Sequence, residues 1–303
     1  MHLNSQTDHE VVTTSYGILY VVATPIGNLE DITFRAIRIL KSVDIIAAED
    51  TRHTSILLSH YQIQPRKLIA YHEHNEDSRS LYLVNQIQDG KSVALVSNAG
   101  TPLVSDPGYT LIQKAYQHGI QVIPIPGASA LLTALCVSGM PVDTFLFKGF
   151  LPRKKNKRMN LLYLFKKIET SCSLIFYESP NRINVLLEEL LMVFGERYVV
   201  IARELTKIHE TLYRGYLSEI SELFKKQHNI KGECTVILSG EIVQMQEVNS
   251  DIQKKIIQLI ETHQDKPSKI ARDIANTYNI PKNLVYSEIL SIQKNNNKNN
   301  LDT

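Results

Sequence analysis

Several features that would place this chain in other protein classes are missing from its sequence. It has no apolar run of 18 or more residues, the length that a membrane-spanning helix requires. Its first fifteen residues, MHLNSQTDHEVVTTS, carry acidic and polar side chains where a secretion signal needs an apolar stretch. We therefore predict a cytoplasmic protein without a membrane anchor, and a disordered polar tail over residues 1–15.

Cysteine is scarce, and the sequence has no recognisable metal or nucleotide motif. Cys136, Cys172 and Cys234 lie far apart, which argues against a disulfide framework and against structural zinc. His72 and His74 are two residues apart, so they would not share one helix face, and no H-E-x-x-H occurs. G-x-G-x-x-G and G-x-x-x-x-G-K-[ST] are also absent. We expect no metal, no standard dinucleotide-binding fold and no P-loop ATPase.

The bulk composition is that of an ordinary globular protein. Apolar residues make up 43% of the 303 positions and charged residues 21%, which allows a core of normal size. The length is about twice that of a common domain, so two lobes are expected. The net charge of +2 says little about partners, because a balanced total can hide a local patch.

The first α/β lobe is predicted over residues 16–127, where short apolar segments alternate with helical ones. Fully apolar strands in such an alternation indicate a mainly parallel sheet with helices on both faces. Ligands of these sheets bind in the loops beyond the carboxyl ends of the strands. Strands are expected at 18–23, 43–48, 92–96 and 121–125, and helices near 33–41, 55–60, 80–88 and 109–118.

The second α/β lobe is predicted over residues 128–242, and a small helical segment over residues 250–292. The helical segment resembles a helix-turn-helix unit, although a helical cap on the second lobe explains it equally well. The asparagine-rich end, residues 293–303, is predicted to be a disordered tail. In the second lobe, strands are expected at 144–147, 173–177, 198–202 and 233–238, and helices near 129–136, 157–168 and 182–194.

Three turn-rich segments follow strands of the first lobe. Residues 97–108 contain two glycines, two prolines and five small polar residues directly after a buried strand. Such a loop can present main-chain groups to a compact polar ligand, but an ordered surface loop explains the composition equally well. In residues 124–130, Ser129 can cap the helix that follows, and Gly127 leaves room for a ligand. Residues 24–28 form a third small-residue turn at the same edge of the sheet.

Charged side chains gather at the end of the second strand. Glu49 and Asp50 follow it directly, and Arg52 comes two residues later. Adjacent acids at a ligand-binding edge can orient a hydroxyl group or accept its proton. The simpler interpretation is an acidic pair at a helix N-terminus, ion-paired with Arg52.

One segment of the second lobe is strongly basic. Seven basic residues and no acidic ones occur between Arg153 and Lys167. A cluster of like charges repels itself, so an anionic partner such as RNA phosphate is a natural explanation, with a solvated helix start as the alternative. We predict RNA contacts for Arg153, Lys154, Lys155, Lys157 and Arg158.

Together, these segments resemble the tetrapyrrole methylase-like (class III) methyltransferases, and among them the members that act on ribosomal RNA. The fragments are weak singly, but eight of them occur in the expected order between residues 20 and 233. They are YVVATPIGNLEDIT at 20–33, AEDTR at 48–52, the loop at 97–108, IPGASA at 125–130, FKGFLP at 147–152, YESPNR at 177–182, ARELTK at 202–207 and KGE at 231–233.

The resemblance implies S-adenosylmethionine bound in a cleft between the two lobes, and a homodimer. It also implies 2′-O-methylation of a cytidine in the decoding region of small-subunit (16S) ribosomal RNA, as free RNA or in the 30S subunit. On this view Glu49 or Asp50 is the base, Arg52 lies beside them, and Lys207 steers the hydroxyl group or neutralises a phosphate. The expected cofactor-binding residues are Pro25, Gly27, Asn98, Ala99, Gly100, Thr101, Ser105, Asp106, Pro107, Pro126, Gly127, Ser129, Ala130, Tyr177, Ala202 and Gly232.

One position departs from the family pattern, and two other functions remain open. The family commonly has an aspartate where this chain has Asn98, which keeps an acceptor but loses the charge. An aspartate that held a charged cofactor group would bind more tightly than Asn98, whereas one that only braced the turn would be replaced without loss. The alternatives are a methyltransferase for a tetrapyrrole precursor or a protein side chain, and a non-catalytic RNA-binding protein; the basic segment argues against the first, and the convergent loops argue against the second.

Overall fold

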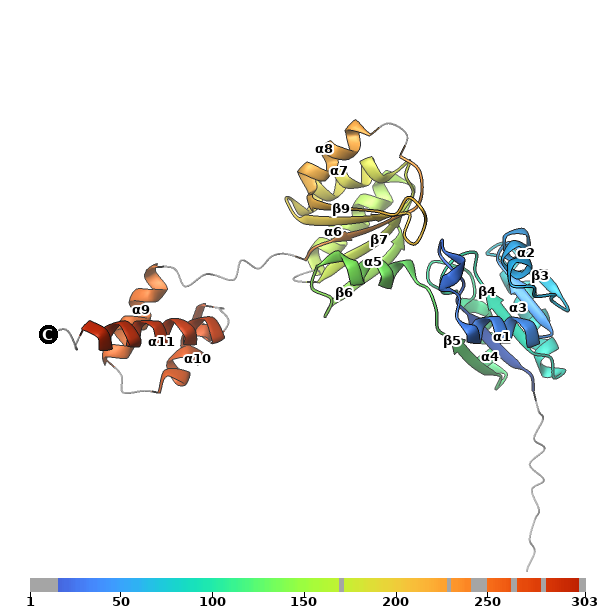
Figure 1. The fold of residues 1–303 in the computed structure, drawn as a ribbon, viewed down its shortest axis with the longest axis horizontal. Helices are drawn as coiled ribbons and strands as arrows, with labels where there is room; N and C mark the ends of the chain where they lie inside the picture. The colour runs from blue at the N-terminus through green and yellow to red at the C-terminus, as the bar shows by residue number, and fades with distance from the viewer. Residues whose placement is uncertain are drawn as a thin grey trace, which may run out of the picture. The chain divides into compact units, whose positions relative to one another are not determined.

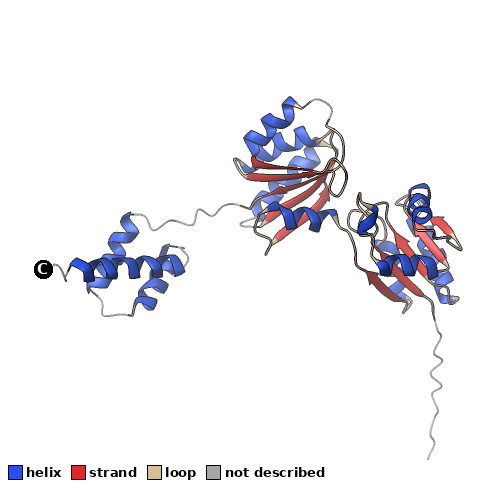
Figure 2. Ribbon diagram, in the orientation of Figure 1, coloured by secondary structure: helices blue, strands red, loops and turns tan. Residues whose placement is uncertain are grey.

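The structure is a computed structural model that describes residues 16–168, 172–227, 230–240, 250–262, 266–278 and 282–299. The tail expected over residues 1–15 lies outside the described residues. The chain divides into two compact units (Figures 1 and 2). The first unit holds both α/β lobes and ends at Ser239, and the second begins at Gly240 and holds the C-terminal helices.

The first lobe is built on a five-stranded parallel sheet in the order β3-β2-β4-β1-β5. Every residue of β2 and β4 is buried, because helices cover both faces, as the uninterrupted apolar runs predicted. The strands are β1 (Ile18–Val22), β2 (Ile45–Ala48), β3 (Leu68–Ala70), β4 (Val93–Val96) and β5 (Gln121–Ile125).

Two pairs of helices cover the faces of this sheet. Helices α1 (Phe34–Ser42) and α2 (Thr51–His60) share one apolar cluster with the sheet, in which Ala36, Leu40 and Leu58 are buried. Helices α3 (Glu76–Gln88) and α4 (Tyr109–Gln117) belong to a second cluster with the sheet. A short 3-10 turn (Leu29–Asp31) precedes α1. Because the strands are parallel, the loops after β1, β2 and β4 leave the sheet at one edge.

The second lobe is a mixed five-stranded sheet in the order β6-β7-β10-β8-β9. Strands β6 and β7 are parallel, and the remaining neighbours are antiparallel. Helices α6, α7 and α8 share one apolar cluster with the sheet, and α5 belongs to another. The elements are α5 (Ala130–Ser138), β6 (Phe145–Phe150), α6 (Lys155–Ile168), β7 (Ser173–Glu178), α7 (Ile183–Phe194), β8 (Tyr198–Arg203), β9 (Thr211–Tyr216), α8 (Leu217–Lys226) and β10 (Cys234–Leu238).

Three of these elements were not predicted. Strand β3 is only three residues long and half-buried, and β9 is an edge strand with no fully apolar run. Helix α8 begins directly after β9. The spacing of residues that share a face therefore changes from 2 to 3.6 residues without a turn residue to mark the boundary. Short, partly exposed elements give little periodicity, which is why the sequence did not reveal them.

The second unit consists of α9 (Ser250–Thr262), α10 (Pro267–Tyr278) and α11 (Lys282–Asn299). These helices share an apolar core of their own, in which Ile256, Ala271, Val285 and Ile289 are fully buried. The prediction of a disordered tail from residue 293 was wrong as far as residue 299, because α11 continues to Asn299. Once the packed part of α11 has nucleated the helix, each further residue adds one backbone hydrogen bond. No helix among the described residues is long and apolar enough to span a membrane.

Candidate active site

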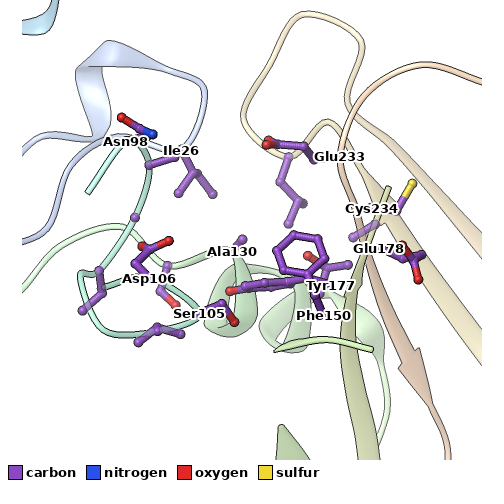
Figure 3. A pocket seen from close by; sticks show the side chains of 18 of the residues that line it. Ile26, Asn98, Ser105, Asp106, Ala130, Phe150, Tyr177, Glu178, Glu233 and Cys234 are labelled. Carbon is purple, nitrogen blue, oxygen red and sulfur yellow. The ribbon is translucent and has the colours of Figure 1, made fainter. Parts of the chain in front are cut away.

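Loops from both lobes line one cavity at the carboxyl-end edge of the first sheet (Figure 3). Its empty space, including the open mouth, is about 990 Å³. The first lobe contributes Ile26, Glu49, Asn98, Ala99, Gly100, Thr101, Val104, Ser105 and Asp106, followed by Ser129 and Ala130 at the start of α5. The second lobe contributes Phe150, Tyr177, Glu178, Ala202, Glu204, Leu205, Lys207, Glu233, Cys234 and Thr235.

The loop after β4 is held in an unusual backbone conformation. Gly100 has a φ of +81°, and the non-glycine residues Leu103 and Ser105 have φ values of +73° and +71°. Two backbone hydrogen bonds of 2.9 and 3.0 Å join Gly100 to Thr24 in the loop after β1. Left-handed conformations at non-glycine residues cost free energy, and they gather where the surrounding structure imposes them for function. The predicted ligand-binding loop is therefore a fixed, strained loop that lines the cavity.

Asn98 is tied to the neighbouring strand end by its backbone. Its N–H donates a 3.1 Å hydrogen bond to Oε2 of Glu49. The side-chain Oδ1 of Asn98 is buried and accepts no hydrogen bond from the described residues. The backbone therefore braces the turn, and the side-chain amide is available to a ligand in the cavity.

The cavity is strongly acidic. Among the described residues that line it, five carboxylates accompany the single cation Lys207: Glu49, Asp106, Glu178, Glu204 and Glu233. Burial, together with the negative charge of Glu49, raises the pKa of Asp106 to about 7, although a hydrogen bond with Ser97 opposes the shift. This arrangement favours a ligand that carries positive charge, because such a ligand relieves the repulsion between the carboxylates.

Lys207 is held as a cation. Its Nζ lies 2.8 Å from Oε1 of Glu204 and 3.1 Å from Oε2 of Glu233. Burial lowers the pKa of Lys207, but the hydrogen bond with Glu204 and the charge of Glu233 outweigh it, so the pKa is raised overall. Lys207 is therefore unsuited to accept a proton, and its positive charge is already balanced by Glu204 and Glu233.

At the start of α2, Asp50 and Arg52 make the contacts of the simpler interpretation, an acidic residue at a helix N-terminus that is ion-paired with Arg52. Neither residue lines the cavity. The Asp50 side chain caps α2 by accepting from the N–H of Arg52, and it also forms an ion pair with the Arg52 guanidinium at 2.7 Å. These hydrogen bonds hold the pKa of Asp50 well below its usual range, which makes it a poor base. Of the two adjacent acids, only Glu49 reaches the cavity.

Six of the predicted cofactor-binding residues do not line the cavity, and the three glycines among them lie close to neighbouring segments. Gly27 lies against the loop that carries Lys207, and a Cβ there would come within 2.5 Å of Lys207 Cγ. A Cβ on Gly127 would come within 2.9 Å of Ala23 Cβ, and one on Gly232, which has a φ of +89°, would overlap Glu204. These glycines allow neighbouring loops to approach closely. The six residues are Pro25, Gly27, Pro107, Pro126, Gly127 and Gly232.

Nine cavity-lining residues were not among the predicted site residues. Glu178 and Glu204 belong to the quoted fragments YESPNR and ARELTK, whose predicted site residues, Tyr177, Ala202 and Lys207, also line the cavity. Apolar wall residues such as Ile26 carry no chemical signal that separates them from a core residue. The nine are Ile26, Val104, Phe150, Glu178, Glu204, Leu205, Glu233, Cys234 and Thr235.

The basic segment at the start of α6 divides into an exposed part and a buried residue. Arg153, Lys154, Lys155 and Lys157 are exposed, in keeping with an anionic partner. Arg158 is buried, and the prediction that it contacts RNA was wrong, because Glu189 holds its guanidinium by hydrogen bonds of 2.5 and 2.8 Å. Its Nη1 also donates to the carbonyl oxygens of Pro152 and Arg153.

Two α/β lobes around an acidic cavity suit the binding of a ligand that carries positive charge. The chain belongs to the tetrapyrrole (corrin/porphyrin) methylases, because the sequence model of that family matches residues 18–221. The resemblance drawn from the eight sequence fragments is thereby confirmed, as is the α/β fold class.

Relatives with known names support the same assignment. The chain is 51% identical to ribosomal RNA small subunit methyltransferase I of Halalkalibacterium halodurans, over 77% of this chain and 80% of that protein. It is 46% identical to the protein of the same name from Thermotoga maritima, over 74% of this chain and 99% of the relative. Uroporphyrin-III C-methyltransferase from Thermus thermophilus, solved with S-adenosylhomocysteine, shares the fold with a TM-score of 0.52 and 18% identity, over 75% of this chain and 99% of that one.

Proposed function

We propose that this protein is an S-adenosylmethionine-dependent methyltransferase that methylates the ribose 2′-hydroxyl group of a cytidine in the decoding region of small-subunit ribosomal RNA. The observation that carries the proposal is the close similarity, over most of both chains, to relatives named for methylation of that RNA. The family resemblance further implies a homodimer, whereas the cytoplasmic location and the absence of a metal are expectations from the sequence alone.

The cavity fits this cofactor by charge. S-adenosylmethionine, when bound, supplies an activated methyl group on a positively charged sulfonium. The acidic lining of the cavity suits a cation, and the loop after β4 offers backbone groups at Ala99 and Thr101 together with the free Oδ1 of Asn98. Ala130, Tyr177 and Ala202 would form the apolar part of the binding site.

Glu49 is the residue best placed to receive the proton of the attacking hydroxyl group. It lines the cavity, and no ion pair to it is found in the part of the chain that the structure describes. Glu204 is a weaker base, because its hydrogen bond with Lys207 lowers its pKa. Since methyl transfer is an in-line displacement, correct placement of the hydroxyl group supplies much of the rate.

The decisive experiment is a methylation assay with labelled S-adenosylmethionine and small ribosomal subunits from cells that lack the gene. Label in the RNA at an alkali-resistant 2′-O-methylcytidine supports cofactor, substrate and position of attack together. Label that appears only in a tetrapyrrole precursor or in protein contradicts the RNA substrate but leaves the methyltransferase assignment intact. No binding of the cofactor contradicts the proposal as a whole.

Binding of S-adenosylmethionine is expected to strengthen with pH around neutrality. Asp106, with its pKa of about 7, is largely protonated at pH 6 and largely ionised at pH 8. If only the ionised form holds the cation well, the apparent affinity rises about tenfold between these pH values. Calorimetric titration at several pH values measures this change. Asp106→Asn should bind weakly with no such pH dependence; a variant that keeps the wild-type pH profile would rule out Asp106 as the titrating group.

The exposed basic residues at the start of α6 are expected to bind RNA phosphate. Lys154→Ala with Lys155→Ala should weaken binding to the small subunit, and the weakening should be larger at low salt. The slope of log affinity against log salt should fall by about 0.7 to 0.9 for each phosphate that the variant no longer neutralises. The matched control is Lys226→Ala, an exposed lysine of α8, which should leave the slope unchanged. Equal slopes for all three proteins would exclude this segment from the RNA interface.

A further inference from the structure

Phe150, the last residue of β6, exposes an aromatic ring at the cavity. Its side chain is 54% exposed and lines the cavity, and its ring centroid lies 5.7 Å from that of Tyr177 in an edge-to-face arrangement. Figure 3 shows Phe150 and Tyr177 together on the second-lobe side of the cavity, with Asp106 and Asn98 on the other side. An aromatic ring left half in water beside a ligand cavity is a feature of binding surfaces.

A β-bulge turns Phe150 toward the cavity. Up to Phe147, strand β6 pairs with β7 in simple register, Phe147 facing Ile175, but Gly149 then faces Phe176 and Phe150 faces Tyr177. Lys148 is the extra residue. If Lys148 were paired with Phe176 in simple register and no bulge formed, Phe150 would face Glu178, and its ring would point to the opposite face of the sheet, where Phe176 belongs to the apolar core. The bulge therefore moves this ring from the core side to the cavity side.

The backbone beside the bulge fixes this geometry against the first lobe. Gly149 has a φ of +70°, a conformation that favours glycine, and a Cβ there would come within 2.2 Å of Ser105 Oγ. Ser105 belongs to the strained loop after β4 that lines the same cavity. The position of the Phe150 ring is thus set by a bulge, a glycine and a direct contact with the predicted cofactor loop.

Phe150 also lies three residues before the start of the basic segment at Arg153. Leu151 and Pro152 follow it, and the exposed Arg153, Lys154 and Lys155 come next. Proteins that bind single-stranded nucleic acid combine a basic path for the phosphates with aromatic rings on which bases stack. When a nucleotide is turned out of its strand so that its ribose enters a cavity, its base loses its stacking neighbours, and an aromatic side chain can replace them.

We propose that Phe150 is the platform on which the base of the target nucleotide stacks while its ribose enters the cavity. This inference rests on the proposed function and extends it, since it assigns a substrate-positioning residue that the sequence did not suggest. The phosphates on either side of that nucleotide would follow the basic residues of α6, so the base and backbone contacts come from one continuous stretch of chain.

The test compares Phe150→Ala, Phe150→Leu and Phe150→Tyr with the wild-type protein on small subunits that lack the modification. The methylation rate at saturating subunit should fall about 10- to 100-fold in the alanine and leucine variants, as expected for removal of one base–aromatic stack. Phe150→Tyr should restore most of the rate. Affinity for S-adenosylmethionine, measured by calorimetry, and affinity for the subunit should each stay within about threefold, because phosphate contacts dominate the latter.

The matched control is Phe145→Ala, on the same strand, where the ring is 37% exposed but lies outside the cavity lining; it should methylate normally. A leucine variant as active as the wild type would show that Phe150 is only an apolar filler and would overturn the proposal. A loss of cofactor affinity that matches the loss of rate would assign the ring to the cofactor instead, and would also overturn it. If the wild-type protein itself labels no RNA, the proposed function fails, which is a separate outcome.

Discussion

Replacing Glu49 with glutamine is expected to lower the rate of methyl transfer to ribosomal RNA by about 10²- to 10⁴-fold, the usual contribution of a general base. Glutamine is isosteric, and its side-chain oxygen can still accept the hydrogen bond from the Asn98 N–H that braces the turn. The cavity should therefore keep its shape while losing its proton acceptor. The rate is measured in a single-turnover assay with labelled cofactor, and cofactor affinity is measured separately by calorimetry.

The control for Glu49→Gln is the neighbouring carboxylate. Asp50→Asn keeps a good capping side chain on α2 and removes a charge that does not reach the cavity, so its rate should stay close to that of the wild type. A large loss of rate in Asp50→Asn with a normal rate in Glu49→Gln would reverse the assignment made from the geometry. A parallel loss of rate and cofactor affinity in Glu49→Gln would make Glu49 a cofactor ligand and not the base.

Replacing Arg158 with alanine is expected to destabilise the α/β unit by about 3 to 5 kcal/mol, because it leaves a buried carboxylate without its partner. The guanidinium of Arg158 is held by both oxygens of Glu189 and by the carbonyl oxygens of Pro152 and Arg153. Since most domains are stable by only about 5 to 15 kcal/mol, such a loss is large. Urea unfolding followed by circular dichroism measures it.

Two further variants separate this structural role from RNA binding. Arg158→Met combined with Glu189→Leu removes both buried charges, and should recover much of the lost stability. Arg153→Ala removes an exposed charge five residues earlier and should leave stability nearly unchanged while weakening RNA binding. If Arg158→Ala unfolded like the wild type but bound RNA poorly, the original prediction for this residue would be right after all.

The first sheet was largely predictable because burial on both faces leaves a simple pattern. The runs at β1, β2, β4 and β5 are short, apolar and bounded by turn residues, and the structure has strands at all four. Since ligands of parallel sheets bind beyond the carboxyl ends of the strands, the loops that follow these strands were predicted to lie near a ligand. In contrast, β3 has only three half-buried residues, too few to show a period.

The site was predictable at the level of segments and less so at the level of side chains. The sequence marks residues 97–108 as a special loop, and seven of these twelve residues line the cavity. It does not show that Asp50 turns back to cap α2 while Glu49 turns inward, nor that Arg158 points into the lobe while Lys157 points to solvent. Those directions depend on tertiary partners such as Glu189, which lies 31 positions away in the sequence.

The separate core of the C-terminal helices affects how the midpoint and the free energy of unfolding of this protein are interpreted. The C-terminal unit has one apolar cluster of its own and the α/β unit has four others, so two-state unfolding of the whole chain is not to be assumed. A single midpoint or a single free energy of unfolding would then average over two transitions, of which only one belongs to the catalytic lobes. The relative from Thermotoga maritima, which matches 224 residues of this chain with 99% of its own length, has no room for an equivalent of every segment here. The free energy of unfolding of the C-terminal helices should therefore be measured separately from that of the α/β unit.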